Sequence, residues 1–261
     1  MKDFKSKYSD FIQRIKKLTF QLLKNDEQNN LIFENPVRLD NIDEKVVLIL
    51  GLNPSGDSED HEGFMQFIDN EELLKKHSSS KAHNERIFYP LYFKPNYELV
   101  KNLEPKMWWA SNQDKIRNIE HYIVNVLKKS NEWNMLDQAI ENEKLKVGPY
   151  LVFADIFNLH CTNSKEFIKQ INENDVVIKK IMDSIFDYYD PTLVVVTNSF
   201  VSNLLLRIYG DNQVEKAEFT IDNRVIILSG FVSSGRLDVF NRTRLIADIN
   251  KHRHLLNKTS V

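Results

Sequence analysis

Short apolar runs alternate along the chain with stretches of helical periodicity. Four runs rich in β-branched residues predict strands at about 45–51, 151–157, 192–197 and 225–228. Helices are predicted at about 1–24, 114–129, 134–142, 164–188, 199–209 and 240–256. Strands that alternate with helices predict an α/β fold, namely a three-layer α/β/α sandwich around a central, mostly parallel four-stranded sheet.

The chain carries no internal repeat and no stretch that resembles a domain linker. Its 261 residues are 42% hydrophobic and 28% charged, which is typical of a soluble globular protein. We therefore expect a single domain over residues 1–261, with residues 1–44 as an N-terminal helical extension. We also expect it to be a monomer.

Charge and cysteine content narrow the function classes only slightly. The net charge of -2 does not require a nucleic-acid partner, although a local basic strip is compatible with it. The single cysteine, Cys161, rules out a disulfide framework and a cysteine-ligated iron–sulfur cluster within one chain. No run approaches the roughly 18 apolar residues needed to cross a bilayer, so we expect a cytoplasmic protein without membrane contact. No histidine spacing matches a metal site, and no metal or other cofactor is expected.

Small or amide residues follow each predicted strand. They are Gly51-Leu52-Asn53, Asn158, Thr197-Asn198-Ser199 and Ser229-Gly230. In open α/β sheets ligands bind beyond the carboxyl ends of the strands, so these residues are candidates for one site. An asparagine amide offers one acceptor and two donors, which suits the edge of a pyrimidine.

The segment Gly51-Leu52-Asn53-Pro54-Ser55-Gly56 resembles the first motif of the uracil-DNA glycosylase superfamily. It is most similar to the branches that use Gly-x-Asn-Pro-Gly. Phe157-Asn158-Leu159 resembles the segment whose asparagine binds the flipped base in that family. The stretch from Ser229 to Ser234 stands where the family has His-Pro-Ser and a loop that wedges into DNA. The resemblance covers roughly residues 45–250, but no histidine lies between Cys161 and Lys251.

This resemblance implies an enzyme that hydrolyses the N-glycosidic bond of a flipped pyrimidine base in DNA. Asn53 would position the attacking water, Asn158 would read the base edge, and Ser229 would donate to the leaving base in place of the missing histidine. Asp57 is the carboxylate nearest to Asn53 in this acidic stretch and could activate the water. The remaining candidates are Gly51, Leu52, Pro54, Phe64 and Phe67 for base binding, and Ser233, Ser234 and Arg236 for DNA contact.

Simpler interpretations remain open for each of these residues. Asn-Pro-Ser-Gly is also an ordinary turn sequence, and Asn158 could be an amide that caps a loop. Phe64 and Phe67 could belong to the core, and Arg236 could lie on a solvated face. The whole chain could accordingly be a catalytically silent member of the fold that binds a nucleotide or nucleic acid, or a hydrolase of a small nucleoside or nucleotide.

Overall fold

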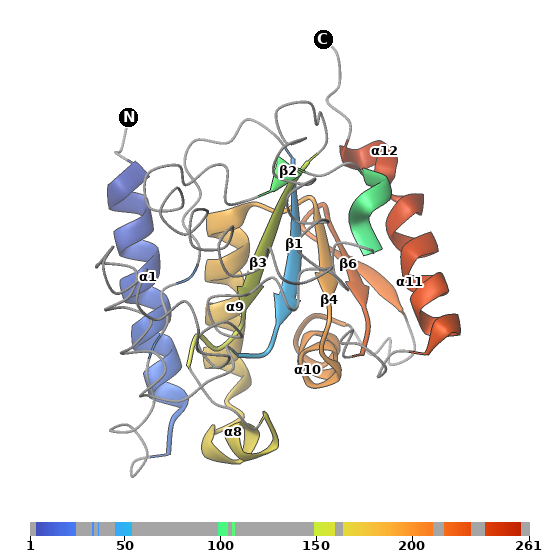
Figure 1. The fold of residues 1–261 in the computed structure, drawn as a ribbon. Coiled ribbons are helices and arrows are strands. Elements are labelled where there is room, and N and C mark those ends of the chain that lie inside the picture. The colour runs from blue at the N-terminus through green and yellow to red at the C-terminus, as the bar shows by residue number, and fades with distance from the viewer. Residues whose placement is uncertain are drawn as a thin grey trace, which may run out of the picture.

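Figure 1 shows the computed structural model, in which the described residues are 4–24, 33, 36, 45–53, 99–103, 106–107, 149–159, 164–210, 217–230 and 238–256. The strands among them are β1 (Val46–Gly51), β2 (Lys106–Met107), β3 (Tyr150–Asp155), β4 (Leu193–Val196), β5 (Glu218–Ile221) and β6 (Arg224–Leu228). The helices are α1 (Phe4–Leu22), the 3-10 helix η1 (Lys101–Leu103), α8 (Ser164–Gln170), α9 (Asp175–Tyr189), α10 (Ser199–Tyr209), α11 (Val239–Lys251) and α12 (Arg253–Leu256).

The strands form one mixed but mostly parallel sheet in the order β2-β3-β1-β4-β6-β5. All neighbours pair in parallel except β5, which is antiparallel to β6. The predicted α/β class is confirmed, and the four predicted strands lie side by side as β3-β1-β4-β6. The predicted strand number is wrong, because the two edge strands β2 and β5 extend the sheet to six strands among the described residues.

The edge strand β5 escaped prediction because it lacks a continuous apolar run. Its four residues are half-buried or exposed, whereas residues 225–228 of its partner β6 are buried. A tight turn joins the two strands, with positive φ angles of 48° at Asp222 and 74° at Asn223. Aspartate and asparagine tolerate this left-handed conformation better than most residues, so this dipeptide was the available sequence signal for a hairpin.

The predicted helix at 164–188 is in fact two helices, α8 and α9. Ile171 forms an isolated antiparallel bridge with Leu23, which interrupts the helix. Asn174 then begins α9, because its side-chain oxygen accepts hydrogen bonds from the backbone N–H groups of Val176 and Val177. The predicted final helix is likewise divided at His252 into α11 and α12.

Both faces of the central strands are buried. Val46, Leu48 and Leu50 of β1 pack in one cluster with side chains of α1 and α9. The alternate residues Val47 and Ile49 are also buried, although they lie outside that cluster. Because successive side chains of a strand point to opposite faces, the sheet is covered on both sides.

The N-terminal helix packs on α9. The rings of Phe11 and Tyr188 are stacked with their centroids 4.0 Å apart, and Phe11 meets Tyr189 edge-on. In Figure 1, α1 and α9 lie together on one side of the strands and α11 lies on the other. None of the described helices is long and apolar enough to cross a membrane.

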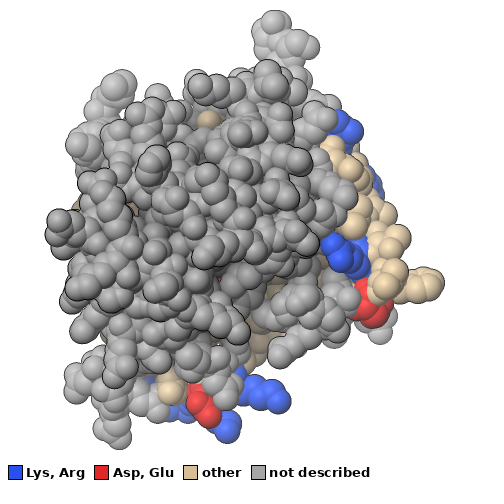
Figure 2. Space-filling view, viewed as in Figure 1, with Lys and Arg blue, Asp and Glu red and all other residues tan. Residues whose placement is uncertain are grey.

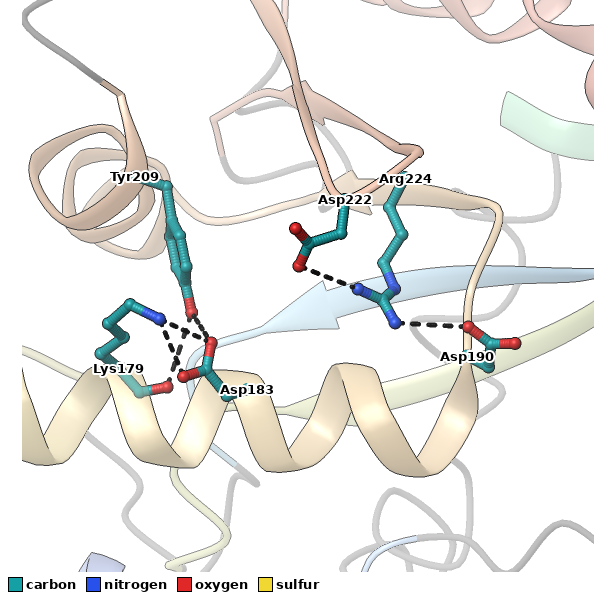
Figure 3. Close-up of polar contacts among 6 residues, drawn as sticks. All are labelled: Lys179, Asp183, Asp190, Tyr209, Asp222 and Arg224. Atoms are coloured by element: carbon teal, nitrogen blue, oxygen red, sulfur yellow. Dashed lines mark hydrogen bonds and ion pairs between the residues drawn. The ribbon is translucent and has the colours of Figure 1, made fainter.

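A group of polar contacts anchors the hairpin to α9 (Figure 3). Arg224, the first residue of β6, forms ion pairs with Asp190 at the end of α9 and with Asp222 in the turn. Asp190 lies just before β4, so these contacts are at the amino ends of the strands. They therefore belong to the end of the sheet opposite to the candidate site.

A second contact in Figure 3 joins α10 to α9. The hydroxyl group of Tyr209 donates a hydrogen bond of 2.7 Å to Asp183, which also pairs with Lys179. Burial of the ring, together with this hydrogen bond, raises the pKa of Tyr209 far above its ordinary value. The phenol is neutral at physiological pH and acts as a structural donor.

Candidate functional site

The candidate site lies beyond the carboxyl ends of the parallel strands. The register pairs Gly51 with Asp155, and it also aligns Leu50 with Val196 and Val196 with Leu228. The residues that follow, Asn53, Asn158, Thr197 and Ser229, therefore all leave the sheet at the same edge. Of the predicted site residues, Gly51, Leu52, Asn53, Asn158 and Ser229 are among the described ones.

The strand order reverses beside β1. From β1 the chain passes to β3 on one side and later returns to β4 on the other side of β1. Such a reversal is the point at which open α/β sheets bind their ligands. It lies between the segment that follows β1, with Asn53, and the segment that follows β4, with Thr197.

Asn53 is half-buried and is held against the segment that follows β3. Pairing between the two segments continues beyond the strands, because Ile156 N–H donates to the Gly51 carbonyl and Phe157 N–H to the Leu52 carbonyl, at 3.2 and 2.9 Å. The Asn53 amide donates a long hydrogen bond of 3.4 Å to the carbonyl of Leu159. The structure thus brings together the two asparagine segments that are 105 positions apart, at Asn53 and Asn158.

Asn158 is 4% exposed, and its amide donates a hydrogen bond of 3.3 Å to the carbonyl of Asp155. A bond to the residue three positions earlier is what an amide that caps a loop would form. Base recognition by Asn158 therefore remains a prediction.

Asp155, the last residue of β3, is a residue of this edge that was not predicted from the sequence. A Cβ atom added at Gly51 would lie 2.2 Å from an Asp155 carboxylate oxygen, so the half-buried carboxylate lies directly against the Gly51 backbone. Only a glycine at position 51 leaves room for the Asp155 carboxylate. One feature of the sequence could have indicated Asp155 as a site residue. It is an acidic residue at the carboxyl end of an apolar run that was predicted to be a parallel strand.

Ser229 lies on the other side of the strand reversal. Its carbonyl accepts a hydrogen bond of 2.8 Å from the Ser202 hydroxyl group of α10. Its own hydroxyl is buried, at 7% exposure of the residue, and has no hydrogen-bond partner among the described residues. An unpaired buried hydroxyl costs about 1–3 kcal/mol, so this group is an available donor for a bound molecule.

Two helices begin at the same edge, and their caps are already occupied. The Asn198 side chain accepts hydrogen bonds from the N–H groups of Phe200 and Val201 at the start of α10. Asp238 caps α11, and the hydrogen bond from the Asn241 backbone lowers the pKa of its carboxyl group. Arg244 of α11 pairs with Asp248 and approaches the carbonyl of Leu228 at 3.5 Å.

The remaining predicted site residues lie outside the described ones. They are Pro54, Asp57, Phe64, Phe67, Ser233, Ser234 and Arg236. Within the described part of the chain, no group of three or more His, Cys, Asp or Glu side chains could hold a metal ion.

Comparison with known proteins adds no relative. No protein-family model matches the chain, and no curated protein sequence matches it.

Proposed function

We propose that the chain is a uracil-DNA-glycosylase-like hydrolase that cleaves the N-glycosidic bond of a flipped pyrimidine in DNA. The observation that carries this proposal is the position of Asn53. It follows the central strand β1 where the strand order reverses, and its amide contacts the segment that contains Asn158. The resemblance of the Gly51–Gly56 segment to the first glycosylase motif supplies the role of that asparagine.

The proposed reaction transfers the electrons of the bond between C1′ and the base to the leaving base, while water adds to C1′. The Asn53 amide can orient the water, but it is too weak a base to take its proton. Two carboxylates are candidates for that task, Asp57 and Asp155, of which Asp155 lies against Gly51. The Ser229 hydroxyl would donate to the leaving base anion, more weakly than a histidine would.

The other predicted residues keep their proposed roles. Leu52, Pro54, Phe64 and Phe67 would form the walls around the base, and Ser233, Ser234 and Arg236 would contact the DNA backbone. We further propose that the protein acts as a cytoplasmic monomer, and that helices form complete layers on both sides of the sheet. The burial of alternate residues on both faces of β1 supports this three-layer arrangement.

A catalytically silent binding protein of the same fold is the second candidate. The amide hydrogens of Asn53 and Asn158 both donate to backbone carbonyls, which is how structural asparagines behave. The absence of histidine between Cys161 and Lys251 also favours this alternative.

Single-turnover excision from uracil-containing oligonucleotides, single- and double-stranded, tests the proposal. We expect slow release of uracil and faster release of 5-fluorouracil, because a poorly stabilised leaving anion depends on its own acidity. Asn53→Ala should lower the rate by about 10²–10⁴-fold. The matched control is Asn203→Ala, which truncates an exposed asparagine on α10 and should leave the rate unchanged.

Replacement of Ser229 by His should accelerate uracil release more than 5-fluorouracil release. Equal rates for the two bases in the wild type would contradict the proposed weakness of the donor. If neither base is released, the glycosylase proposal fails and the silent binding protein remains.

A further inference from the structure

We infer that Asp155 is the general base of the proposed reaction and that Thr197 is a second hydrogen-bond donor to the leaving base, beside Ser229. This inference rests on the proposed function and names the residues of the same site that contact the water and the base. It starts from three side chains, Asp155, Thr197 and Ser229, which are called the polar row below.

The polar row crosses the sheet at the carboxyl ends of neighbouring strands. Asp155 of β3 pairs with Gly51 of β1. The Thr197 N–H donates to the Leu50 carbonyl at 3.0 Å and so continues the pairing of β4 with β1, and Ser229 is likewise the first residue after β6. Because aligned residues of a parallel sheet point to the same face, the three side chains of the row share one face.

This face of the sheet is apolar up to the polar row. The preceding residues on the same face are paired with one another across β3, β1, β4 and β6, and all are buried: Phe153, Ile49, Val195 and Ile227. The residues in between, such as Leu50 and Val196, belong to the core cluster on the opposite face. The polar row therefore marks the border between the core and the candidate site.

The Asp155 carboxylate lies over β1 and not only over its own strand. One of its oxygens is 2.2 Å from the place of a Cβ atom at Gly51. Asn53, two residues after Gly51, is held toward the same side, because its amide donates to the carbonyl of Leu159 after β3. An amide that can orient a water and a carboxylate that can accept its proton thus lie on the same side of the strand reversal.

Thr197 lies on the other side of Gly51 from Asp155. Its hydroxyl group donates to the Leu50 carbonyl over 3.4 Å, a long hydrogen bond, and that carbonyl already accepts the Thr197 N–H. The hydroxyl group can therefore turn to a ligand at little cost. The residue is half-buried, so a ligand in the site can reach it.

The spacing of the polar row suits a displacement by water. Neighbouring strands are about 4.8 Å apart, which places Thr197 one spacing and Ser229 two spacings, roughly 10 Å, from the volume above Gly51. Glycoside hydrolases that use direct displacement by water separate their base from their proton donor by about 6.5–9.5 Å. A carbonyl of a nucleobase lies further from the sugar carbon than a glycosidic oxygen does, so the two hydroxyl groups are placed for the leaving base.

The reaction then proceeds across the row. Asp155 accepts a proton from the water as the water oxygen bonds to C1′. The bond between C1′ and N1 of the base breaks, and its electron pair goes to the base. Hydrogen bonds from the Thr197 and Ser229 hydroxyl groups stabilise this anion until solvent protonates it. Two neutral donors thereby take the place of the single histidine that the resemblance implies.

Hydroxyl groups, and not cations, are the donors that the described part of this edge offers. Figure 2 shows the described Lys and Arg side chains of this view on the side where α11 lies and at the lower end of the molecule. Arg244 of α11 contacts the carbonyl of Leu228, but it already forms an ion pair with Asp248. Stabilisation of the anion therefore falls to Thr197 and Ser229.

The pH dependence of single-turnover uracil excision tests the role of Asp155. The wild-type rate should fall in acid, because a protonated carboxyl group cannot accept the proton of the water. Asp155→Asn should lower the rate at neutral pH by about 10²–10⁴-fold and abolish the fall in acid, whereas Asp57→Asn should retain that fall. The matched control is Asp187→Asn, which changes an exposed carboxylate on α9 and should alter neither rate nor pH dependence. Circular dichroism at each pH confirms that the variants are folded.

The ratio of 5-fluorouracil release to uracil release tests the role of Thr197. Thr197→Val keeps the shape of the side chain but removes the donor, so it should slow uracil release about tenfold or more. It should also raise the ratio, because the more stable 5-fluorouracil anion depends less on donors. Thr197→Ser should restore the wild-type ratio, and the control Thr220→Val, at an exposed position on β5, should leave it unchanged. A purely structural role of Thr197 would slow both bases equally.

A fall in acid that persists in Asp155→Asn, or an unchanged ratio in Thr197→Val, would overturn the inference and leave the glycosylase proposal intact. If the wild type releases neither base, the role of Asp155 fails together with that proposal. The contact of Thr197 with the base is then tested by fluorescence anisotropy with an oligonucleotide that contains 2′-deoxypseudouridine, whose C-glycosidic bond resists hydrolysis. Weaker binding by Thr197→Val than by Thr197→Ser would support the contact, and equal binding would reject it.

Discussion

At the residue scale, the absence of a side chain at Gly51 allows the Asp155 carboxylate at the end of β3 to lie against the end of β1. The Asp155 carboxylate occupies the volume in which any other residue at position 51 would carry its Cβ atom. This contact explains why a glycine ends an otherwise apolar, β-branched strand, where it weakens the strand by itself.

Gly51→Ala should therefore displace the Asp155 side chain. We expect the free energy of unfolding to fall by about 1–3 kcal/mol, because the added methyl group meets a carboxylate oxygen in a packed region. Urea unfolding of Gly51→Ala, Asp155→Ala and the double variant measures this. The double variant should be more stable than the sum of the two single losses predicts, and strict additivity would show that the two positions do not interact.

At the element scale, two asparagine-capped helices offer a matched pair. Asn174 caps α9 and Asn198 caps α10, each by accepting two backbone hydrogen bonds. Both helices begin toward the carboxyl ends of the strands, but only α10 follows its strand directly, and its Ser202 hydroxyl group contacts the Ser229 backbone.

Asn174→Ala and Asn198→Ala should each lower the free energy of unfolding by about 1 kcal/mol, because each leaves two N–H groups without their acceptor. Only Asn198→Ala should also slow uracil excision, since it loosens the first turn of α10 beside Ser229. Thermal unfolding and the excision assay together separate the two effects. An equal loss of excision in both variants would indicate that stability alone is responsible.

At the scale of the whole molecule, Glu218 joins the edge strand β5 to the end of α11. It forms an ion pair with Lys251 and a hydrogen bond of 3.0 Å with the His252 ring, and its side chain is 30% exposed. Burial acts to raise the pKa of Glu218, but the hydrogen bonds from Lys251 and His252 outweigh it and lower the pKa below the ordinary value of 4.5. The folded state therefore favours the ionised carboxylate.

This shift predicts an acid dependence of global stability. The contribution of Glu218 is complete above about pH 4.5 and is lost as the pH falls through the lower pKa of the folded state. Urea unfolding between neutral and acidic pH should show wild type more stable than Glu218→Gln at pH 7, with the difference shrinking in acid. The exposed Glu166 on α8 provides the control Glu166→Gln. A constant difference between wild type and Glu218→Gln would contradict the role of these contacts.

The sequence by itself determined the four central strands and the class of the fold. Runs such as Val46–Leu50 are apolar at every position. All side chains of such a strand are buried only where both faces of the sheet are covered. The helical spacing of hydrophobic residues was likewise enough to predict α1 and α10, and the predicted ends of both helices lie close to the observed ones.

Only the tertiary structure decided the strand order, the edge strand β5 and the contact between Gly51 and Asp155. Strand order depends on pairing between segments that are far apart in the chain, such as Val46 with Tyr150 and Val47 with Leu193. The local sequence of a strand does not specify which strand lies beside it. The half-exposed β5 is stabilised by its partner β6 and not by its own composition. The contact at Gly51 arises from the parallel register of β1 and β3, so the sequence could identify the glycine but not the carboxylate that requires it.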